Sequence, residues 1–338
     1  MYIHVYIDTN IHRITLYYDY LRRILTDTLN TRDNLPMTAQ AFVPGHITGV
    51  FRIFDEKKNL LECGSIGAGF SVEIGTLTTV SAIENESLEI TTIYNDEPID
   101  ANVTKTVVRR LVETYERQFK VKVTHKSSLP SGVGFGASGA GALGTALALG
   151  RLLDTTMNET TAAGYAHCAE VENRTGLGDV IAQTFGGIEI RTHPGGPGIG
   201  KVVNISSGES QTVVLAGAPG LKTRDVLTNS ENRAKINAIG DELVERIINN
   251  PTIDTFISCS REFTESVGLS TKRVTAALRD LDDSGLHQSS MVMIGDSVFC
   301  FCKDEQLQSA VDILTKYWTT SQVQVTKISE EGGRLVSW

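Results

Sequence analysis

The chain has 338 residues, a formal net charge of −9, and a composition that is 41% hydrophobic and 21% charged. These values are typical of a globular protein with enough chain for one large domain or two ordinary ones. The negative charge makes a nucleic-acid backbone a poor partner, and no apolar run is long enough to span a bilayer, so neither nucleic acid nor membrane is an expected partner. The five cysteines include no C-x-x-C pair, which argues against a disulfide framework or a structural zinc site and favours the cytoplasm.

Residues 1–38 stand apart from the rest of the chain. They are aromatic and basic, show little periodicity, and end in the turn-prone TLNTRDNLP. They also lack the compact apolar core and small-residue cleavage site of a secretory signal. Two interpretations stay open: an extension that packs weakly, or a natural start at Met37 with a non-native segment before it.

From residue 39 the pattern becomes regular. Three strand-like stretches, AFVPGHITGVFRIF, LECGSIGAGFSVEIG and LTTVSAI, are separated by turn residues and followed by LEITTIY. An amphipathic helix over 103–115, the strand KVKVTHKSSLP, a glycine-rich loop and two further helices come next. The stretch GLGDVIAQTFGGIEIRT predicts a loop, a short helix and a strand. Residues 193–201, HPGGPGIGK, are the candidate hinge between two halves.

The second half predicts an alternation of strands and helices. A strand, a helix, one or more helices over 255–283, a strand pair turning at Gly295-Asp296, a helix and a final strand follow in order. This order is close to the split βαβ, ferredoxin-like arrangement. We therefore predict an α+β fold with an N-terminal domain over 39–200 and a ferredoxin-like domain over 201–338. Cys300 and Cys302 would share one face of a strand, and we expect core residues there in preference to metal ligands.

The loop LPSGVGFGASGAGALG, residues 129–144, matches G-x-G-x-x-G. A dinucleotide fingerprint requires a hydrophobic strand running into the first glycine and an acidic residue after the next strand, and both are missing here. No Gly-Lys-Ser or Gly-Lys-Thr is present either, which excludes a Walker A loop. Small residues that lead into an apolar helix leave N–H groups at its positive end, an arrangement that suits phosphate. A packing loop beneath a helix is the alternative.

The same loop resembles the second motif of the GHMP kinases, P-x-x-x-G-L-G-S-S-A-A. The residues that fit are Pro130, Gly134, Gly136, Ser138 and Ala140, whereas Phe135 replaces the usual Leu and Ala137 the first Ser. AFVPGHITGVF resembles the first motif, and the third is represented only by LHQSSMVMIGDSVF. Three stretches together, PGHITGVF, GSIGAGFSVEIG and AHCAEVENRTGLGDVIAQTFGG, are similar to the archaeal pantoate kinase branch, with the resemblance running over about 39–338.

This resemblance implies a two-domain GHMP kinase-like fold, with a ribosomal S5 domain 2-like N-terminal domain that binds ATP. It implies ATP and Mg²⁺ as cofactors and the phosphorylation of pantoate to 4-phosphopantoate in archaeal coenzyme A biosynthesis. Two alternatives stay open: another GHMP kinase, of homoserine or mevalonate type, and a regulator that binds a nucleotide without catalysis. The oligomeric state is also open, with a homodimer as one option.

The resemblance also implies roles for individual residues. The ATP phosphates would lie over Pro130, Gly132, Gly134, Gly136, Ala137, Ser138 and Gly139. Ser138 and Glu170 would hold magnesium, and Asp179 would orient or deprotonate the substrate hydroxyl. From the residues alone, the N-cap of the helix DVIAQTF is the first interpretation of Asp179, and the two roles are compatible. Glu172 lies about 200° around the helix from Glu170, so we expect a surface acid there.

At the substrate end of the site, a substrate that carries a carboxylate needs a positively charged side chain to bind it. Arg191 is expected to supply a guanidinium fork, and His46 in PGHITG a hydrogen bond to the carboxylate or to a hydroxyl. Ser65 and Arg52 are weaker candidates for the same side.

Overall fold

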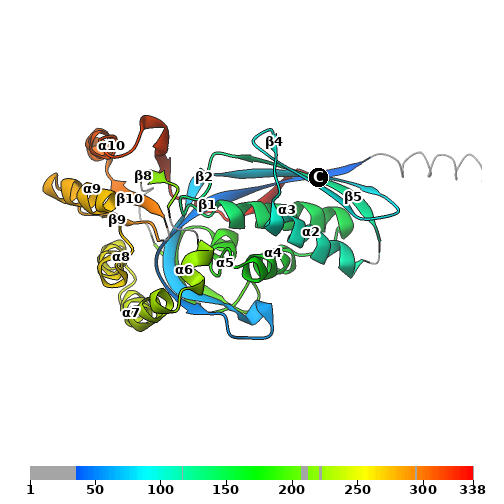
Figure 1. The fold of residues 1–338 in the computed structure, drawn as a ribbon, viewed down its shortest axis with the longest axis horizontal. Coiled ribbons are helices and arrows are strands. Elements are labelled where there is room, and N and C mark those ends of the chain that lie inside the picture. The colour runs from blue at the N-terminus through cyan, green and yellow to red at the C-terminus, as the bar shows by residue number, and fades with distance from the viewer. Residues whose placement is uncertain (1–35, 116, 207–211, 221–222, 294, 338) are drawn as a thin grey trace, which may run out of the picture.

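The computed structural model describes residues 36–337 except 116, 207–211, 221–222 and 294. The extension predicted over residues 1–38 therefore lies almost wholly outside the described residues. The element order is mixed α and β, in two sheets flanked by helices (Figure 1). No helix in the described part of the chain is both long and apolar enough to cross a membrane.

Two long antiparallel strands, β1 (Met37–Phe54) and β2 (Gly64–Glu84), lie side by side within the larger sheet. The remaining strands of that sheet are β3 (Glu89–Tyr94), β4 (Glu97–Pro98), β5 (Phe119–Ser127), β6 (Ile188–His193), β7 (Lys201–Ile205) and β12 (Arg334–Ser337). The sequence predicts two separate strands within residues 61–83, and this is wrong: β2 continues through them. Its central turn-like residue Gly75 lies opposite Pro44, where the β1–β2 register shifts at an irregularity, so the glycine marks a bend and not a break.

Four helices pack beside the larger sheet: α2 (Asn102–Thr114), α3 (Ala137–Leu153), α4 (Glu159–Asn173) and α5 (Asp179–Phe185) (Figure 1). α3 is the central one and contacts β1, β2 and the other three helices. Every residue from Gly139 to Gly150 is buried, because small and apolar side chains cover the helix on all sides. The loop that precedes α3 is thereby attached to a buried helix.

The smaller sheet contains β8 (Thr212–Ala218), β9 (Ser289–Met291), β10 (Asp296–Cys302) and β11 (Val323–Lys327). Its order is β11-β8-β10-β9, antiparallel throughout. The remaining helices of the described chain are α6 (Thr223–Thr228), α7 (Ser230–Asn249), α8 (Ile253–Val267), α9 (Lys272–Asp283) and α10 (Leu307–Leu314), and its short 3-10 turns are η1 (Leu60–Glu62), η2 (Asp304–Gln306) and η3 (Thr320–Gln322). Of these, α7 packs on β1 and β2 of the larger sheet. The predicted α+β class is confirmed, as is the β9–β10 hairpin. Cys300 and Cys302 are buried core residues of β10.

The hinge predicted over residues 193–201 is wrong. These residues join β6 to β7, which pair antiparallel with His193 opposite Lys201, so they form a hairpin loop within the larger sheet. Glycine and proline mark a tight turn as readily as a linker. β12 also returns to the larger sheet by pairing with β1. The two sheets therefore do not divide the chain at residue 200, and the domain limits at 39–200 and 201–338 stay a prediction.

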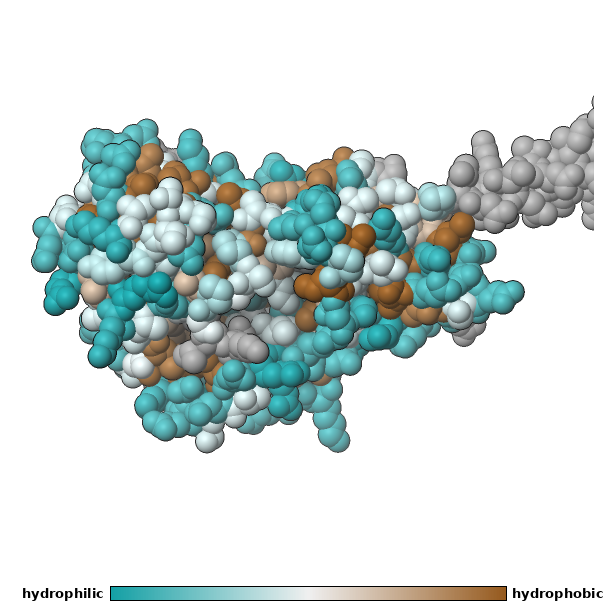
Figure 2. Space-filling model, turned by 45° about the horizontal axis from the view of Figure 1, so that its top comes forward, coloured by the Kyte–Doolittle hydropathy of each residue, from teal (hydrophilic) through white to brown (hydrophobic). Residues whose placement is uncertain are grey.

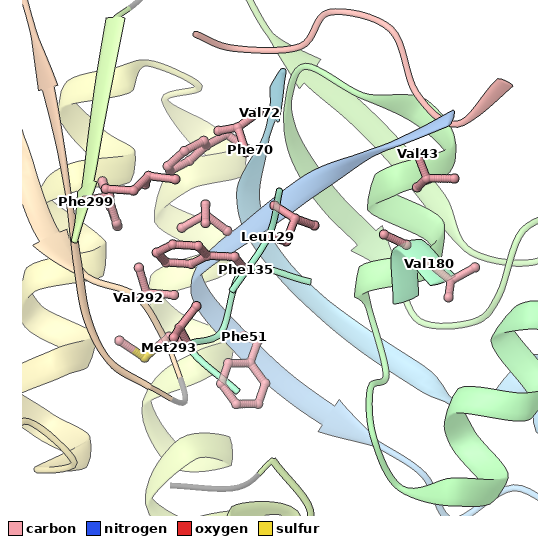
Figure 3. Close-up of a cluster of buried hydrophobic side chains, with 14 of the residues drawn as sticks. Val43, Phe51, Phe70, Val72, Leu129, Phe135, Val180, Val292, Met293 and Phe299 are labelled. Carbon is pink, nitrogen blue, oxygen red and sulfur yellow. The ribbon is translucent and has the colours of Figure 1, made fainter. Parts of the chain in front are cut away.

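A cluster of aromatic rings joins the two sheets. Phe70 of β2 lies 5.1 Å from Phe299 and 4.9 Å from Phe301 of β10, and 6.2 Å from Phe256 of α8, between ring centroids. Figure 3 shows Phe135, from the glycine-rich loop, among these buried side chains. On the face drawn in Figure 2, hydrophobic side chains form small patches within a largely hydrophilic surface. The loop is thus anchored by the core that holds the two sheets together.

Candidate active site

The glycine-rich loop lines a cleft of about 640 Å³. Gly132, Gly134 and Gly136 all have positive φ, of 76°, 85° and 70°, a conformation that side chains with a Cβ rarely adopt. The first helical hydrogen bond of α3 is donated by Ala140 to Gly136 O, at 2.9 Å. The N–H groups of residues 137–139 therefore precede the helical ladder and lie at its positive end, as a phosphate cradle requires.

Neighbouring elements hold the loop through its carbonyl groups. Ser297 Oγ of β10 donates to Val133 O at 2.8 Å, and the His46 N–H of β1 donates to Phe135 O at 3.1 Å. Gln183 Nε2 of α5 donates to Gly136 O at 3.0 Å and to Pro44 O at 2.9 Å. Gln183 and Ser297 are not singled out by the sequence. The variant third motif, LHQSSMVMIGDSVF, supplies Ser297 and therefore supports the loop.

Gly136→Ala is expected to raise the KM for ATP by a factor on the order of 10. A residue with a Cβ is strained at φ 70°, and this Cβ would lie 3.0 Å from the backbone nitrogen of His46. Steady-state kinetics at varied ATP check this. Gly268→Ala is the control, since Gly268 also has positive φ, 68°, but nothing lies within 4 Å of its Cβ position. An unchanged KM for ATP in Gly136→Ala would contradict the assigned role of the loop.

Ser138 and Glu170 meet at the start of α3. Ser138 Oγ donates to Glu170 Oε1 at 2.5 Å, and Glu170 is buried at the end of α4. Burial, reinforced by the charge of Asp179, raises the pKa of Glu170 to about 7 against the opposing effect of the Ser138 hydrogen bond. The other oxygen, Oε2, has no hydrogen-bond partner within the described residues. Oε2 is thus a buried carboxylate oxygen without a partner, next to the cleft but not among the groups that line it.

The turn between α4 and α5 brings Glu170 close to Asp179, as the glycine-containing spacing predicts. A Cβ on Gly176 would lie 2.5 Å from Glu170 Oε2 and 3.3 Å from Asp179 Oδ2. Ser138 Oγ and Glu170 Oε2 are hard oxygen donors of the kind that Mg²⁺ prefers. No cluster of three or more His, Cys, Asp or Glu suited to a metal occurs in the part of the chain that the structure describes. Two protein oxygens, from Ser138 and Glu170, fit a Mg²⁺ that takes its remaining ligands from water and phosphate.

Asp179 lies on the cleft and is held by His46. It is the first residue of α5, whose N-cap is Gly178, and no side-chain cap bond forms, so the N-cap interpretation is wrong. Its Oδ1 lies 2.9 Å from His46 Nδ1, while the His46 Nε2 lies 3.1 Å from Glu189 Oε1. Burial alone would lower the pKa of His46, but Glu189 and Asp179 together raise it to about 9. The two carboxylates therefore favour the protonated form of His46.

The prediction that His46 contacts the substrate directly is wrong. Its side chain is 0% exposed and both ring nitrogens face carboxylates, which leaves no donor for a ligand. Arg191, in contrast, lines the cleft with Ser65. Its Nη1 pairs with Glu189 Oε1, and its Nε has no hydrogen-bond partner among the described residues. Glu189 was missed by the sequence reasoning, although a Glu-x-Arg pair inside the apolar strand IEIRT was a visible signal.

Two other candidates lie elsewhere. Arg52 pairs with Asp241 at 2.6 Å and stacks over the Phe54 ring at 4.4 Å, and it does not line the cleft. Glu172 is an exposed acid paired with Arg110 at 2.6 Å, as predicted. Neither residue belongs to the site.

Comparison with known proteins identifies the class of the chain. Residues 102–187, which include the glycine loop, α4 and Asp179, match the family model of the GHMP kinases N terminal domain. A solved homoserine kinase from Cytophaga hutchinsonii is 16% identical, covers 88% of this chain and 97% of its own, and superposes with a TM-score of 0.63, a likeness of fold. The chain has the fold of the GHMP kinases.

More similar proteins narrow the class. A pantoate kinase of Thermococcus kodakarensis is 37% identical over 287 residues, 82% of this chain and 92% of the relative. A pantoate kinase of Methanocaldococcus jannaschii is 33% identical over 277 residues, 81% of this chain and 96% of the relative. A solved structure described as a phosphotransferase related to the CoA biosynthesis pathway is 32% identical, covers 89% of this chain and 99% of its own, and has a TM-score of 0.79. The chain belongs to the pantoate kinase family.

Proposed function

We propose that this protein transfers the γ-phosphoryl group of ATP to the primary hydroxyl of pantoate, giving 4-phosphopantoate and ADP. One observation carries the proposal: a single cleft joins a phosphate-binding loop, the Asp179 carboxylate and the Arg191 guanidinium. The relatives named pantoate kinase support the substrate. The five cysteines are all free thiols, which supports the cytoplasmic setting predicted from the sequence.

At the nucleotide end, the chain supplies alignment and charge stabilisation. The N–H groups of residues 137–139 and the α3 dipole bind the triphosphate, and the three positive-φ glycines let it approach the backbone. Ser138 and Glu170 would hold Mg²⁺, which neutralises phosphate charge when bound. Phosphoryl transfer depends mainly on such positioning, so holding the loop in a fixed shape contributes directly to catalysis.

At the acceptor end, Asp179 accepts the hydrogen bond of the substrate hydroxyl and takes its proton as the new O–P bond forms and the bond to ADP breaks. His46 occupies Asp179 Oδ1, so Oδ2 is the oxygen left for the hydroxyl. Arg191 binds the pantoate carboxylate, with Ser65 beside it in the lining of the cleft. A hydroxyl for Asp179 and a carboxylate for Arg191 are the two groups that a hydroxy acid such as pantoate supplies.

A coupled assay of ADP release with pantoate, homoserine and mevalonate tests the proposal. Turnover with pantoate well above the other two is the expected result. Preference for homoserine or mevalonate would assign a different GHMP kinase activity, and nucleotide binding without turnover would indicate a regulator.

Arg191→Lys is expected to raise the KM for pantoate by a factor on the order of 10 or more while the KM for ATP changes little. Lysine keeps a positive charge beside the buried Glu189 but loses the fork that matches a carboxylate. Initial rates at varied pantoate and at varied ATP separate the two constants. Arg52→Lys is the control, because Arg52 lies outside the cleft. Equal KM values for pantoate in wild type and Arg191→Lys would remove Arg191 from substrate binding.

A further inference from the structure

Glu189 is a buried charge that the phosphoryl-transfer steps above leave without a role. It lies on β6 between Ile188 and Ile190, and its side chain is 0% exposed. A carboxylate is costly to bury unless it is paired, and each half of a buried pair is costly to remove. Its Oε1 meets two cations at once: His46 Nε2 at 3.1 Å and Arg191 Nη1. Glu189 therefore connects the residue behind Asp179 with the residue proposed to bind substrate.

The register of β6 on β2 places these groups. Glu189 lies opposite Gly69 and Arg191 opposite Gly67. A Cβ on Gly69 would lie 2.7 Å from His46 Nε2, and a Cβ on Gly67 would lie 2.5 Å from Arg191 Nη2. The alternate glycines of GSIGAGF thus make room for the imidazole ring and the guanidinium group. This stretch, conspicuous in the sequence, is accounted for by the two side chains packed over it.

The four charged groups form one alternating row: Arg191, Glu189, His46 and Asp179. Two cations alternate with two carboxylates, so the row is neutral as a whole. A histidine whose two nitrogens both face carboxylates satisfies both contacts only when each nitrogen carries a proton. The titratable groups that face His46 are Asp179 from α5 and Glu189 from β6; β2 contributes Gly69, and the loop contributes Phe135 and Gly136. Removal of Glu189 leaves Asp179 as the only carboxylate against the ring in the described structure.

We propose that Glu189 is a positioning residue of the reaction: it fixes His46, and through it the orientation of Asp179, and at the same time it fixes Arg191. One buried carboxylate would thereby set the separation between the proton-accepting group and the carboxylate-binding group. This inference rests on the proposed function for the role of Arg191, but the link from Glu189 to His46 and Asp179 holds for any hydroxyl acceptor.

The first test compares the kinetics of Glu189→Gln with those of the matched control Glu172→Gln. Gln keeps the size of Glu189 and an acceptor for His46 but removes the charge. We expect kcat to fall and the KM for pantoate to rise, together lowering kcat/KM on the order of 10–100-fold, as for other supporting residues behind a functional group, with little change in the KM for ATP. The control is expected to match wild type, because Glu172 is exposed and paired at the surface. Wild-type kinetics in Glu189→Gln would overturn the proposal.

The second test needs no substrate. NMR of protein labelled at its seven histidines, with His46 assigned from His46→Gln, follows protonation of the ring nitrogens from about pH 6 to about pH 8. His46 is expected to stay doubly protonated over this range in wild type and to lose a proton within it in Glu189→Gln. A neutral His46 in wild type, or identical titrations in the two proteins, would overturn the proposal even if pantoate is the substrate.

A third variant covers a failure to fold. Glu189→Asp keeps the charge on a shorter side chain, and it is expected to retain a doubly protonated His46 while kcat still falls, because the ring moves toward the shorter carboxylate. If Glu189→Gln unfolds but Glu189→Asp has wild-type kinetics, exact positioning by Glu189 is not required, and the proposal fails. If wild type does not turn over pantoate, the same comparison is run with the acceptor that it does use.

Discussion

Asp179→Asn is expected to lower kcat by a factor on the order of 10²–10⁴ while the KM for ATP changes little. Asn keeps an oxygen that accepts from His46 Nδ1, so the side chain stays oriented, but it cannot take the proton of the substrate hydroxyl. The phosphate loop is untouched, since its anchors are Ser297, Gln183 and the His46 N–H. Single-turnover measurements at saturating ATP and pantoate isolate the chemical step.

The control for this substitution is Asp241→Asn. Asp241 is an exposed carboxylate paired with Arg52 and lies outside the cleft, so its loss is expected to leave kcat unchanged. An Asp179→Asn variant with the wild-type rate would show that the carboxylate neither accepts nor orients the hydroxyl.

Glu170→Gln is expected to lower kcat/KM for ATP by a factor on the order of 10²–10³, because a neutral amide replaces the carboxylate proposed to hold Mg²⁺. The same substitution is expected to raise the stability of the folded protein although it lowers activity. The pKa of Glu170 is raised from 4.5 to about 7 in the folded protein, so the folded state binds more protons than the unfolded state between these values. The folded protein accordingly loses stability as pH rises from 4.5 toward 7, and Gln removes this loss.

Thermal unfolding at pH 8 without nucleotide checks the stability effect: Glu170→Gln is expected to melt at or above the wild-type temperature. Titration with Mg²⁺ and ATP on the same samples checks the binding effect. Glu172→Gln, two positions along the chain and exposed, is the control for both. A large loss of stability with unchanged activity would contradict the two expectations together and make Glu170 a structural residue.

The parts of the site that depend on short spacing were predictable. The glycine loop and α3 are adjacent in the chain, and Glu170 and Asp179 are separated only by a glycine-containing turn. Local chemistry therefore fixes much of their geometry. For the same reason the sequence indicates the position of Ser138, at the start of the apolar helix and next to the loop proposed to bind phosphate.

The parts that depend on strand register were not predictable. His46 and Glu189 are 143 positions apart, and they meet only because β6 pairs with the glycine-rich half of β2. A sequence gives the two charges but not their register, and so a buried histidine was interpreted as a substrate contact. The hinge prediction for residues 193–201 failed for a related reason, since local turn chemistry does not reveal which strands pair.

The anchoring of the glycine loop has a consequence for the order of folding. A chain leaves the ribosome from its N-terminus, and the loop is made well before Ser297 of β10 and the closing strand β12. A nascent chain that ends before β10 has the phosphate-binding sequence but lacks one of the bonds that shape it. Nucleotide affinity is therefore expected to rise late in synthesis, and ATP is expected to stabilise finished molecules in preference to truncated ones.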